Sequence, residues 1–435
     1  MIKAYRGEIL HFIDDPAIVG DEQSFQYFED GVLVVENGLV KQLGKTDSIL
    51  SNLDSDVEVI HYQHGLMMPG FIDTHVHYPQ TEMIASYGEQ LLEWLENYTF
   101  PAERQFEDIE HGKKVAQFFL TQLLSAGTTT ALVFGTVHPE SVDAFFTIAE
   151  QKKLRMICGK VLMDSNCPDY LSDTPELGYQ QSKQLIEKWH KKGRLQYAVT
   201  PRFAPTSSKE QLDKAGQLLQ EYPDVYLHTH LSENKDEIAW VGQLFPESKN
   251  YLDVYDKSKL LGRRSVFAHG VHLDDCECKR LGETQSAIAF CPSSNLFLGS
   301  GLFNLSQAQE FNVNVGMGSD IGAGTTFSML STLNEGYKVQ QLRGSKLSPY
   351  QSFYLATLGG ARALDLEGTI GNFAIGAEAD FILLDYHATP LMDKRIKHCK
   401  TLTEKLFTLS MLGDERHIQK THIMGEAISL ESNEA

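Results

Sequence analysis

Histidine and aspartate residues recur in this chain where apolar segments end, and these side chains can bind a metal ion. FIDTHVH ends in His75 and His77, DVYLHTHL contains His228 and His230, and NVGMGSD ends in Asp320. A catalytic zinc ion typically takes three protein ligands of these types together with a water molecule. Hydrogen bonding inside a core would be the better interpretation of one isolated histidine pair. The repetition at several segment ends favours a metal site.

The spacing within each histidine pair places both side chains on one face of a strand. Side chains alternate across a strand, so His75 and His77 point to the same side. The same holds for His228 and His230, and geometry alone does not say which of them would bind the metal. We favour His230, because Glu233 follows three residues later and would face a metal-bound water if a helix begins there. The alternative for Glu233 is a first-turn glutamate that the helix dipole stabilises.

Three candidate residues outside the histidine pairs also lie at the ends of apolar segments. Asp320 lies in GMGSDIGAG, whose glycines allow a tight turn. A turn-forming aspartate is the alternative, but beside the histidines an acidic ligand that also takes a proton from water is favoured. His269 in AHG and Arg202 in PRFAP also lie at segment ends. For Arg202, a structural ion pair within the fold is the alternative to a role in binding.

The central part of the chain alternates eight apolar segments with helix-length segments. The eight are MPGFIDTHVHY, GTTTALVFGT, RMICGKVLMD, LQYAVTPRFAPT, DVYLHTHLSEN, RSVFAHGVHL, SAIAFCPSSN and NVGMGSDIGAG. One helix is expected over residues 207–222, with Ser207 and Glu210 as a capping box. This alternation predicts an α/β fold whose parallel strands close into a (β/α)8 TIM barrel. In such a barrel, chemistry lies at the carboxyl ends of the strands, where all the candidate residues fall.

Both ends of the chain are rich in short strands. Near the amino end, Asn37-Gly38 separates two apolar runs, which is a strong hairpin signal. GAEADFILLDY and HIQKTHIMGEAISL repeat this style near the carboxyl end. The chain is therefore expected to form a barrel over residues 67–366, flanked by strand-rich segments over residues 1–66 and 367–435.

The composition of the chain argues against nucleic acids and membranes as binding partners. The formal net charge of -20 would repel a nucleic-acid backbone, and no basic cluster offsets it. No run approaches the roughly 18 apolar residues of a membrane span, and no leader peptide is recognisable. Six cysteines without a C-x-x-C pair indicate reduced thiols rather than a disulfide framework. We expect a cytoplasmic protein with no nucleic-acid or membrane partner.

The motifs resemble those of the amidohydrolase superfamily: MPGFIDTHVH, HTHLSE, AHG and GSD stand at the expected strands. The resemblance runs through nearly the whole chain and implies that residues 1–66 and 367–435 together form a smaller β-sandwich domain. Members with two metals usually bridge them through a lysine after the fourth strand, which LQYAVTPRFAPT lacks. The resemblance therefore implies one Zn²⁺ per subunit, with iron possible. Within the superfamily, HVHYPQ, PRFAP, HTHLSEN and GMGSDIGAG together are similar to the guanine deaminases. That likeness implies hydrolytic deamination of guanine to xanthine and ammonia, and a homodimer.

The resemblance also assigns roles to residues. The metal ligands would be His75, His77, His230 and Asp320. The substrate-binding residues would be His77, Gln80, Arg202, Phe203, His230, Glu233, His269 and Asp320. The catalytic residues would be Glu233, which protonates N3, Asp320, which accepts a proton from water, and His269, which hydrogen-bonds the new oxygen.

Elementary chemistry agrees with guanine as the substrate. Guanine presents O6 and N7 as adjacent acceptors, which the fork of Arg202 can meet bidentately. Adenine would place an amino donor there, and such a buried mismatch is costly. Gln80 could read the lactam edge and Phe203 could stack on the ring.

Two alternatives and one segment remain open at this point. The chain could be another mononuclear deaminase, of purine, pyrimidine or triazine bases. It could also be a noncatalytic interaction protein on the same scaffold. Residues 81–106 are longer than a standard barrel connection, and their aromatic residues could cover the pocket, pack on a second subunit or form a peripheral helix.

Overall fold

The barrel is built from eight parallel strands in chain order. The computed structural model describes residues 2–87 and 90–429. The barrel strands are β5 (Phe71–His77), β6 (Thr128–Phe134), β7 (Arg155–Gly159), β9 (Gln196–Pro201), β10 (Tyr226–Leu231), β11 (Ser265–His269), β12 (Ala287–Phe290) and β13 (Asn314–Met317). The two-residue strand β8 (Val161–Leu162) adds a short parallel pairing to β9. Each strand falls within one of the eight apolar segments, so the predicted barrel is confirmed.

Individual hydrogen bonds join the first and last strands. The Thr74 hydroxyl donates to the carbonyl of Met317 at 2.9 Å. Just beyond β13, the backbone N–H of Asp320 donates to the carbonyl of His75 in β5 at 2.9 Å, and the N–H of His77 donates to the carbonyl of Ile321 at 2.8 Å. The barrel thereby closes at the end where the candidate residues lie.

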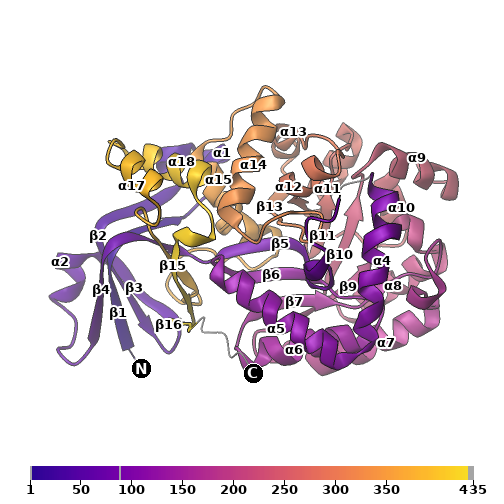
Figure 1. Cartoon of the computed structure of the whole chain (residues 1–435), viewed down its shortest axis with the longest axis horizontal. Coiled ribbons are helices and arrows are strands. Elements are labelled where there is room, and N and C mark those ends of the chain that lie inside the picture. Colours follow the sequence, from indigo (N-terminus) through magenta and orange to yellow (C-terminus); the bar gives the residue numbers. More distant parts are fainter. Residues whose placement is uncertain (1, 88–89, 430–435) are drawn as a thin grey trace.

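Helices surround the barrel (Figure 1). The longest are α5 (Ile109–Ser125), α6 (Pro139–Gln151), α7 (Pro175–Trp189), α8 (Lys209–Glu221) and α14 (Met329–Leu342). Shorter ones are α9 (Lys235–Leu244), α10 (Tyr251–Lys257), α11 (Asp275–Thr284), α12 (Pro292–Phe297), α13 (Leu305–Glu310), α15 (Pro349–Leu355) and α16 (Leu358–Ala363).

The amino end of α8 differs from the prediction. Its cap is Ser208, whose hydroxyl accepts from the N–H of Gln211, and not Ser207 with Glu210. The Ser207 hydroxyl instead lies 3.4 Å from the carbonyl of Leu162, to which it donates. The apolar residues at helical spacing face inward: Leu212, Ala215 and Leu218 are buried, and Leu219 and Tyr222 are half-buried.

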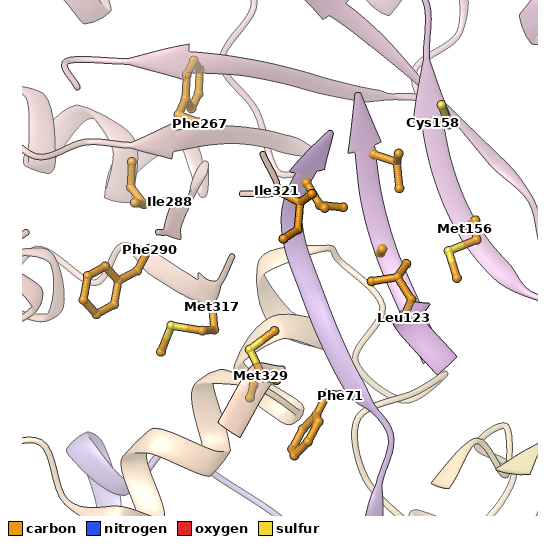
Figure 2. Packing of buried hydrophobic residues seen from close by; sticks show 14 of the residues in the cluster. Phe71, Leu123, Met156, Cys158, Phe267, Ile288, Phe290, Met317, Ile321 and Met329 are labelled. Carbon is orange, nitrogen blue, oxygen red and sulfur yellow. The ribbon is translucent and has the colours of Figure 1, made fainter. Parts of the chain in front are cut away.

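Side-chain alternation along the strands separates two apolar layers. Ile72, Leu132 and Ile157 belong to a cluster that fills the barrel interior. Their neighbours, such as Met156 and Cys158, belong to the larger cluster between strands and helices. Figure 2 shows members of this outer layer. Because both faces are buried, the strands read as continuous apolar runs.

The small domain combines both ends of the chain, which lie side by side in Figure 1. One seven-stranded path joins β16 (Glu426–Ala427), β15 (Ile418–Ile423), β14 (Phe381–Leu384), β4 (Glu58–Pro69), β1 (Ile2–Phe12), β2 (Phe25–Glu36) and β3 (Leu39–Lys45) among the described residues. Asn37 and Gly38 both have positive φ between β2 and β3, as the predicted hairpin requires. Strand β4 continues past residue 66 to Pro69, and the exact boundaries at 66/67 and 366/367 stay predictions.

Two features complete the description. Helices α17 (Pro390–Ile396) and α18 (Leu402–Leu412) lie between β14 and β15 in the chain. Between β5 and α5 the chain forms short helical pieces, including α3 (Leu91–Trp94) and α4 (Phe100–Glu103). In the described part of the chain, no helix combines the length and apolarity needed to cross a membrane.

Candidate active site

Three imidazole rings and one carboxylate converge at the carboxyl ends of β5, β10 and β13. The Nε2 atom of His77 lies 3.2 Å from Nε2 of His75 and 3.3 Å from Nε2 of His230. The Oδ1 atom of Asp320 lies 3.1 Å from Nε2 of His75 and 3.4 Å from Nε2 of His77. The structure thus brings together all four residues predicted as metal ligands.

Outer contacts fix which nitrogen of His230 and of His75 faces the centre. The Nδ1 atom of His230 lies 2.6 Å from the carbonyl oxygen of Arg202, so it must be the protonated nitrogen. The Nδ1 atom of His75 lies 2.7 Å from Nε2 of His228. His228 therefore supports His75 from behind, whereas His230 faces the centre. Such partners of metal-binding histidines set the tautomer and leave the other nitrogen free to bind.

The donor set fits a divalent cation. Burial lowers the pKa values of His75, His77 and His230 far below the usual range, which keeps their rings neutral. Neutral imidazole is the form that binds metals. One proton cannot satisfy three converging nitrogens and a carboxylate, whereas a cation can accept a lone pair from each. The nearby thiol of Cys291 is a poorer ligand, because burial raises its pKa well above the usual range.

Glu233 and His269 face each other beside this cluster. Their atoms Oε2 and Nε2 are 3.5 Å apart, and Nε2 of His269 lies 3.7 Å from Oδ2 of Asp320. Burial raises the pKa of Glu233 to about 7. Burial alone would lower the pKa of His269, but the carboxylates of Glu233 and Asp320 outweigh it and raise that pKa. The pair is therefore suited to holding and moving a proton near neutral pH.

Two residues that the sequence analysis did not identify hold this pair. The hydroxyl of Ser300 donates to Oε1 of Glu233 at 3.1 Å, and Nδ1 of His269 lies 2.9 Å from Oδ1 of Asn295. Both partners follow β12, Asn295 in the short helix α12 and Ser300 in a loop. Asn295 ends the segment SAIAFCPSSN but was not chosen as a candidate, and Ser300 lies outside all eight segments, so the structure was needed to find their roles.

An unusual backbone conformation at two residues also orients their side chains in the site. His269 has a φ of 73° and Asp320 a φ of 52°. A positive φ is uncommon for residues other than glycine and costs free energy, and such residues cluster at functional sites. Here each of them turns the chain at the end of its strand, so that the side chain stays at the mouth of the barrel.

One pocket adjoins the cluster, and all eight predicted substrate-binding residues line it. They are His77, Gln80, Arg202, Phe203, His230, Glu233, His269 and Asp320. The remaining lining is apolar: Leu91, Trp94, Leu95, Leu298 and Ala323. Three of these five side chains come from the segment after β5, so this segment covers the pocket.

Arg202 has a partner within the protein. Its Nη1 atom donates to both carboxylate oxygens of Glu103, at 2.9 and 2.8 Å. The structural ion pair considered as an alternative thus exists, yet the same guanidinium lines the pocket. Glu103 was missed because it lies 99 residues before Arg202 in a segment without periodicity.

Known proteins share this architecture over the whole chain. The model of the amidohydrolase family, whose members are metal-dependent, matches residues 66–428. A guanine deaminase of Escherichia coli (strain K12) is 54% identical over 430 residues, which cover 98% of each chain. The solved structure of an E. coli guanine deaminase superposes with a TM-score of 0.95 at 52% identity, covering 99% of this chain and 100% of that one. A C. acetobutylicum guanine deaminase with bound guanine in its active site gives 0.88 at 30% identity, with the same coverage. The chain belongs to the amidohydrolase family.

Proposed function

We propose that this protein is a guanine deaminase, which hydrolyses guanine to xanthine and ammonia. The observation that carries the proposal is one pocket, in a chain 54% identical to a guanine deaminase, that combines a metal-ligand cluster with Arg202 and Gln80. Arg202 and Gln80 would supply hydrogen-bond donors for the acceptors of a 6-oxopurine. This activity would serve purine catabolism or salvage.

The proposal includes one Zn²⁺ per subunit, with iron as the alternative metal. His75, His77, His230 and Asp320 would hold it, as their converging donor atoms suggest. When bound, the metal would make a water molecule acidic enough to act as a nucleophile near neutral pH. Residues 195–206, which contain β9 and its carboxyl end, include no lysine that could bridge a second ion, and this supports a single metal.

The proton transfers fall to Asp320, Glu233 and His269. Asp320 accepts a proton from the attacking water, whose oxygen forms a bond to C2 of guanine. Glu233, whose pKa of about 7 lets it carry a proton, protonates N3, so that C2 can become tetrahedral. His269 hydrogen-bonds the new oxygen. The bond between C2 and the exocyclic nitrogen then breaks, and the proton held by Asp320 leaves with ammonia. The proton of the C2 hydroxyl passes to Glu233, which leaves the C2 carbonyl of xanthine and restores the protonated glutamic acid.

Arg202, Gln80 and Phe203 would select the base. An arginine fork meets the O6 and N7 acceptors of guanine, whereas adenine places an amino group at position 6. A buried donor facing another donor costs about 1–3 kcal/mol. Phe203 is only 4% exposed and lines the pocket, where it can stack on the purine ring.

The decisive experiment mixes metal-loaded protein with guanine and measures xanthine and ammonia. Adenosine, cytosine and a triazine are assayed in parallel. Equimolar xanthine and ammonia from guanine alone is the expected result. Release of ammonia from another base would point to a different deaminase, and no hydrolysis of any base with a full complement of metal would favour a noncatalytic scaffold.

Location and assembly are part of the same proposal. We expect a cytoplasmic homodimer, as the likeness to guanine deaminases suggests. Light scattering coupled to gel filtration would give the mass in solution. A mass near 48.8 kDa, that of one chain, would contradict the dimer.

A further inference from the structure

A buried carboxylate lies directly behind the two side chains that would read the purine. Glu103 is the last residue of α4 and is 0% exposed. It is not one of the described residues that line the pocket. Its two oxygens accept from Nη1 of Arg202, and Oε1 also lies 3.3 Å from Nε2 of Gln80. One carboxylate thus ties together two pocket residues from different strand ends.

These contacts determine which way the amide of Gln80 points. The ionised carboxylate of Glu103 can only accept, so the Gln80 atom facing it must be the nitrogen. At the other end, the backbone N–H of Gly322 donates to Oε1 of Gln80 at 3.1 Å. The amide therefore cannot be reversed without facing a donor with a donor. One N–H of Gln80 and one lone pair of its oxygen remain for a ligand.

The same carboxylate orients the guanidinium of Arg202. Both contacts use Nη1, and no acceptor in residues 2–87 or 90–429 contacts Nη2 or Nε. The carbon Cζ of Arg202 also lies 5.5 Å from the ring centre of Phe100, three residues before Glu103 in the same segment. The Nε–Nη2 edge is thus the fork left for a substrate with two adjacent acceptors.

We propose that Glu103 is a positioning residue for purine selectivity, which holds Arg202 and Gln80 in the orientation that recognises the 6-oxo edge. The inference rests on the proposed function and deepens it. It assigns to the segment after β5 a polar task in addition to covering the pocket. Glu103 acts through Arg202 and Gln80, and it touches no reacting atom.

The test compares guanine with 2-aminopurine in Glu103→Gln. Both bases carry the same amino group at C2, but 2-aminopurine lacks O6. The substitution keeps the shape of the side chain and removes its charge, and it presents an amide N–H to Arg202 or Gln80. We expect kcat/KM for guanine to fall about 10- to 100-fold, chiefly through KM, while that for 2-aminopurine changes less than about threefold.

Two variants in the same segment serve as controls. Glu96 is exposed, so Glu96→Gln should leave kcat/KM for both substrates unchanged. Glu103→Asp keeps the charge on a shorter side chain and should recover part of the preference for guanine. If Glu103→Gln folds poorly, Glu103→Asp still tests the inference. Its ratio of kcat/KM for guanine to kcat/KM for 2-aminopurine must lie below the ratio of the wild type.

A double-mutant cycle with Arg202→Met separates positioning from general support of the fold. When Arg202 is already absent, Glu103→Gln should lower kcat/KM for guanine less than about twofold, because only the 3.3 Å contact of Glu103 with Gln80 remains. Equal losses for guanine and 2-aminopurine, or additive losses in the cycle, would overturn the inference while leaving the proposed function intact. A wild-type protein that does not turn over guanine would overturn both.

Discussion

Glu233 is the side chain on which proton transfer depends in the proposed reaction. Glu233→Gln keeps the size of the side chain and removes its ability to exchange a proton. We expect the metal content to stay at the wild-type level, because Glu233 is not one of the four converging ligands, and kcat to fall about 10²- to 10⁴-fold. Metal analysis and steady-state kinetics of the same preparation test this. A variant that keeps most of its turnover would exclude Glu233 as the proton carrier.

His228 and His230 are predicted to differ sharply in their effect on metal binding. His230→Ala removes a converging nitrogen, so the purified protein should retain much less than one metal per chain. His228→Ala removes only the partner of His75, and losses of this kind typically reduce metal affinity about 10- to 100-fold. Competition with a chelator measures both affinities. The reverse order of effects would assign the metal to His228.

What could be predicted at this scale depended on local spacing. The period of two in a strand was enough to place His75 and His77 side by side. It could not choose between His228 and His230, because that choice depends on the carbonyl of Arg202 and on the ring of His75. Glu103, Asn295 and Ser300 act through contacts with residues far away in the chain, and no local pattern carries that information.

Among the elements, those with strong periodicity could be predicted and those without it could not. The eight strands and the apolar face of α8 follow from runs and spacing that a single segment contains. The cap of α8 moved by one residue, because Ser208 also bonds both oxygens of the Asp164 carboxylate, 44 residues earlier. The segment after β5 consists of short helical pieces with no regular period, so its position over the pocket had to come from the structure.

The small sheet contains a buried histidine that should make it sensitive to acid. His422 lies in β15, where its ring stacks on Phe381 at 4.0 Å and its Nε2 lies 3.0 Å from the hydroxyl of Tyr62. Burial lowers its pKa to about 3. The unfolded chain, with a value near 6.5, therefore binds more protons below that pH. Stability is complete above pH 6.5 and is lost as the pH falls toward 3, by about 2 kcal/mol at pH 5.

His422→Phe tests this acid sensitivity, because phenylalanine preserves the stacking and cannot be protonated. The difference in Tm between pH 7 and pH 5 should shrink by about 2 °C for a chain of this size, although the variant itself is destabilised by the loss of the bond to Tyr62. Differential scanning calorimetry gives both values. His398 is exposed, so His398→Phe should leave the pH dependence unchanged. A wild-type pH dependence in His422→Phe would contradict the linkage.

On the scale of the whole molecule, the two domains meet through a buried group of charges. Arg155 and Arg194 come from the barrel side, and Glu378 and Asp380 lie just before β14 of the small sheet. Nη1 of Arg194 lies 2.7 Å from Glu378 and 2.7 Å from Asp380, and Arg155 pairs with Glu378. The alternation of strands and helices predicted the barrel, and the strand-rich ends together with the family resemblance predicted the second domain. The contact between them could not be predicted, because it joins residues about 184 positions apart.

Arg194→Met should therefore weaken the junction between the domains. The Asp380 side chain is only 3% exposed and loses its cationic partner in this variant, whereas Glu378 keeps Arg155. Breaking a buried pair by removing one partner costs about 3–5 kcal/mol, which corresponds to a fall in Tm of several °C here. Lys192→Met provides the control. The pair of Lys192 with Glu150 is exposed, so this variant should change Tm by less than about 1 °C.

Calorimetry that gives equal Tm values for the two variants would show that the junction does not depend on this ion pair. A low-temperature transition that appears only in Arg194→Met would show that the small domain unfolds before the barrel once Asp380 has lost its partner.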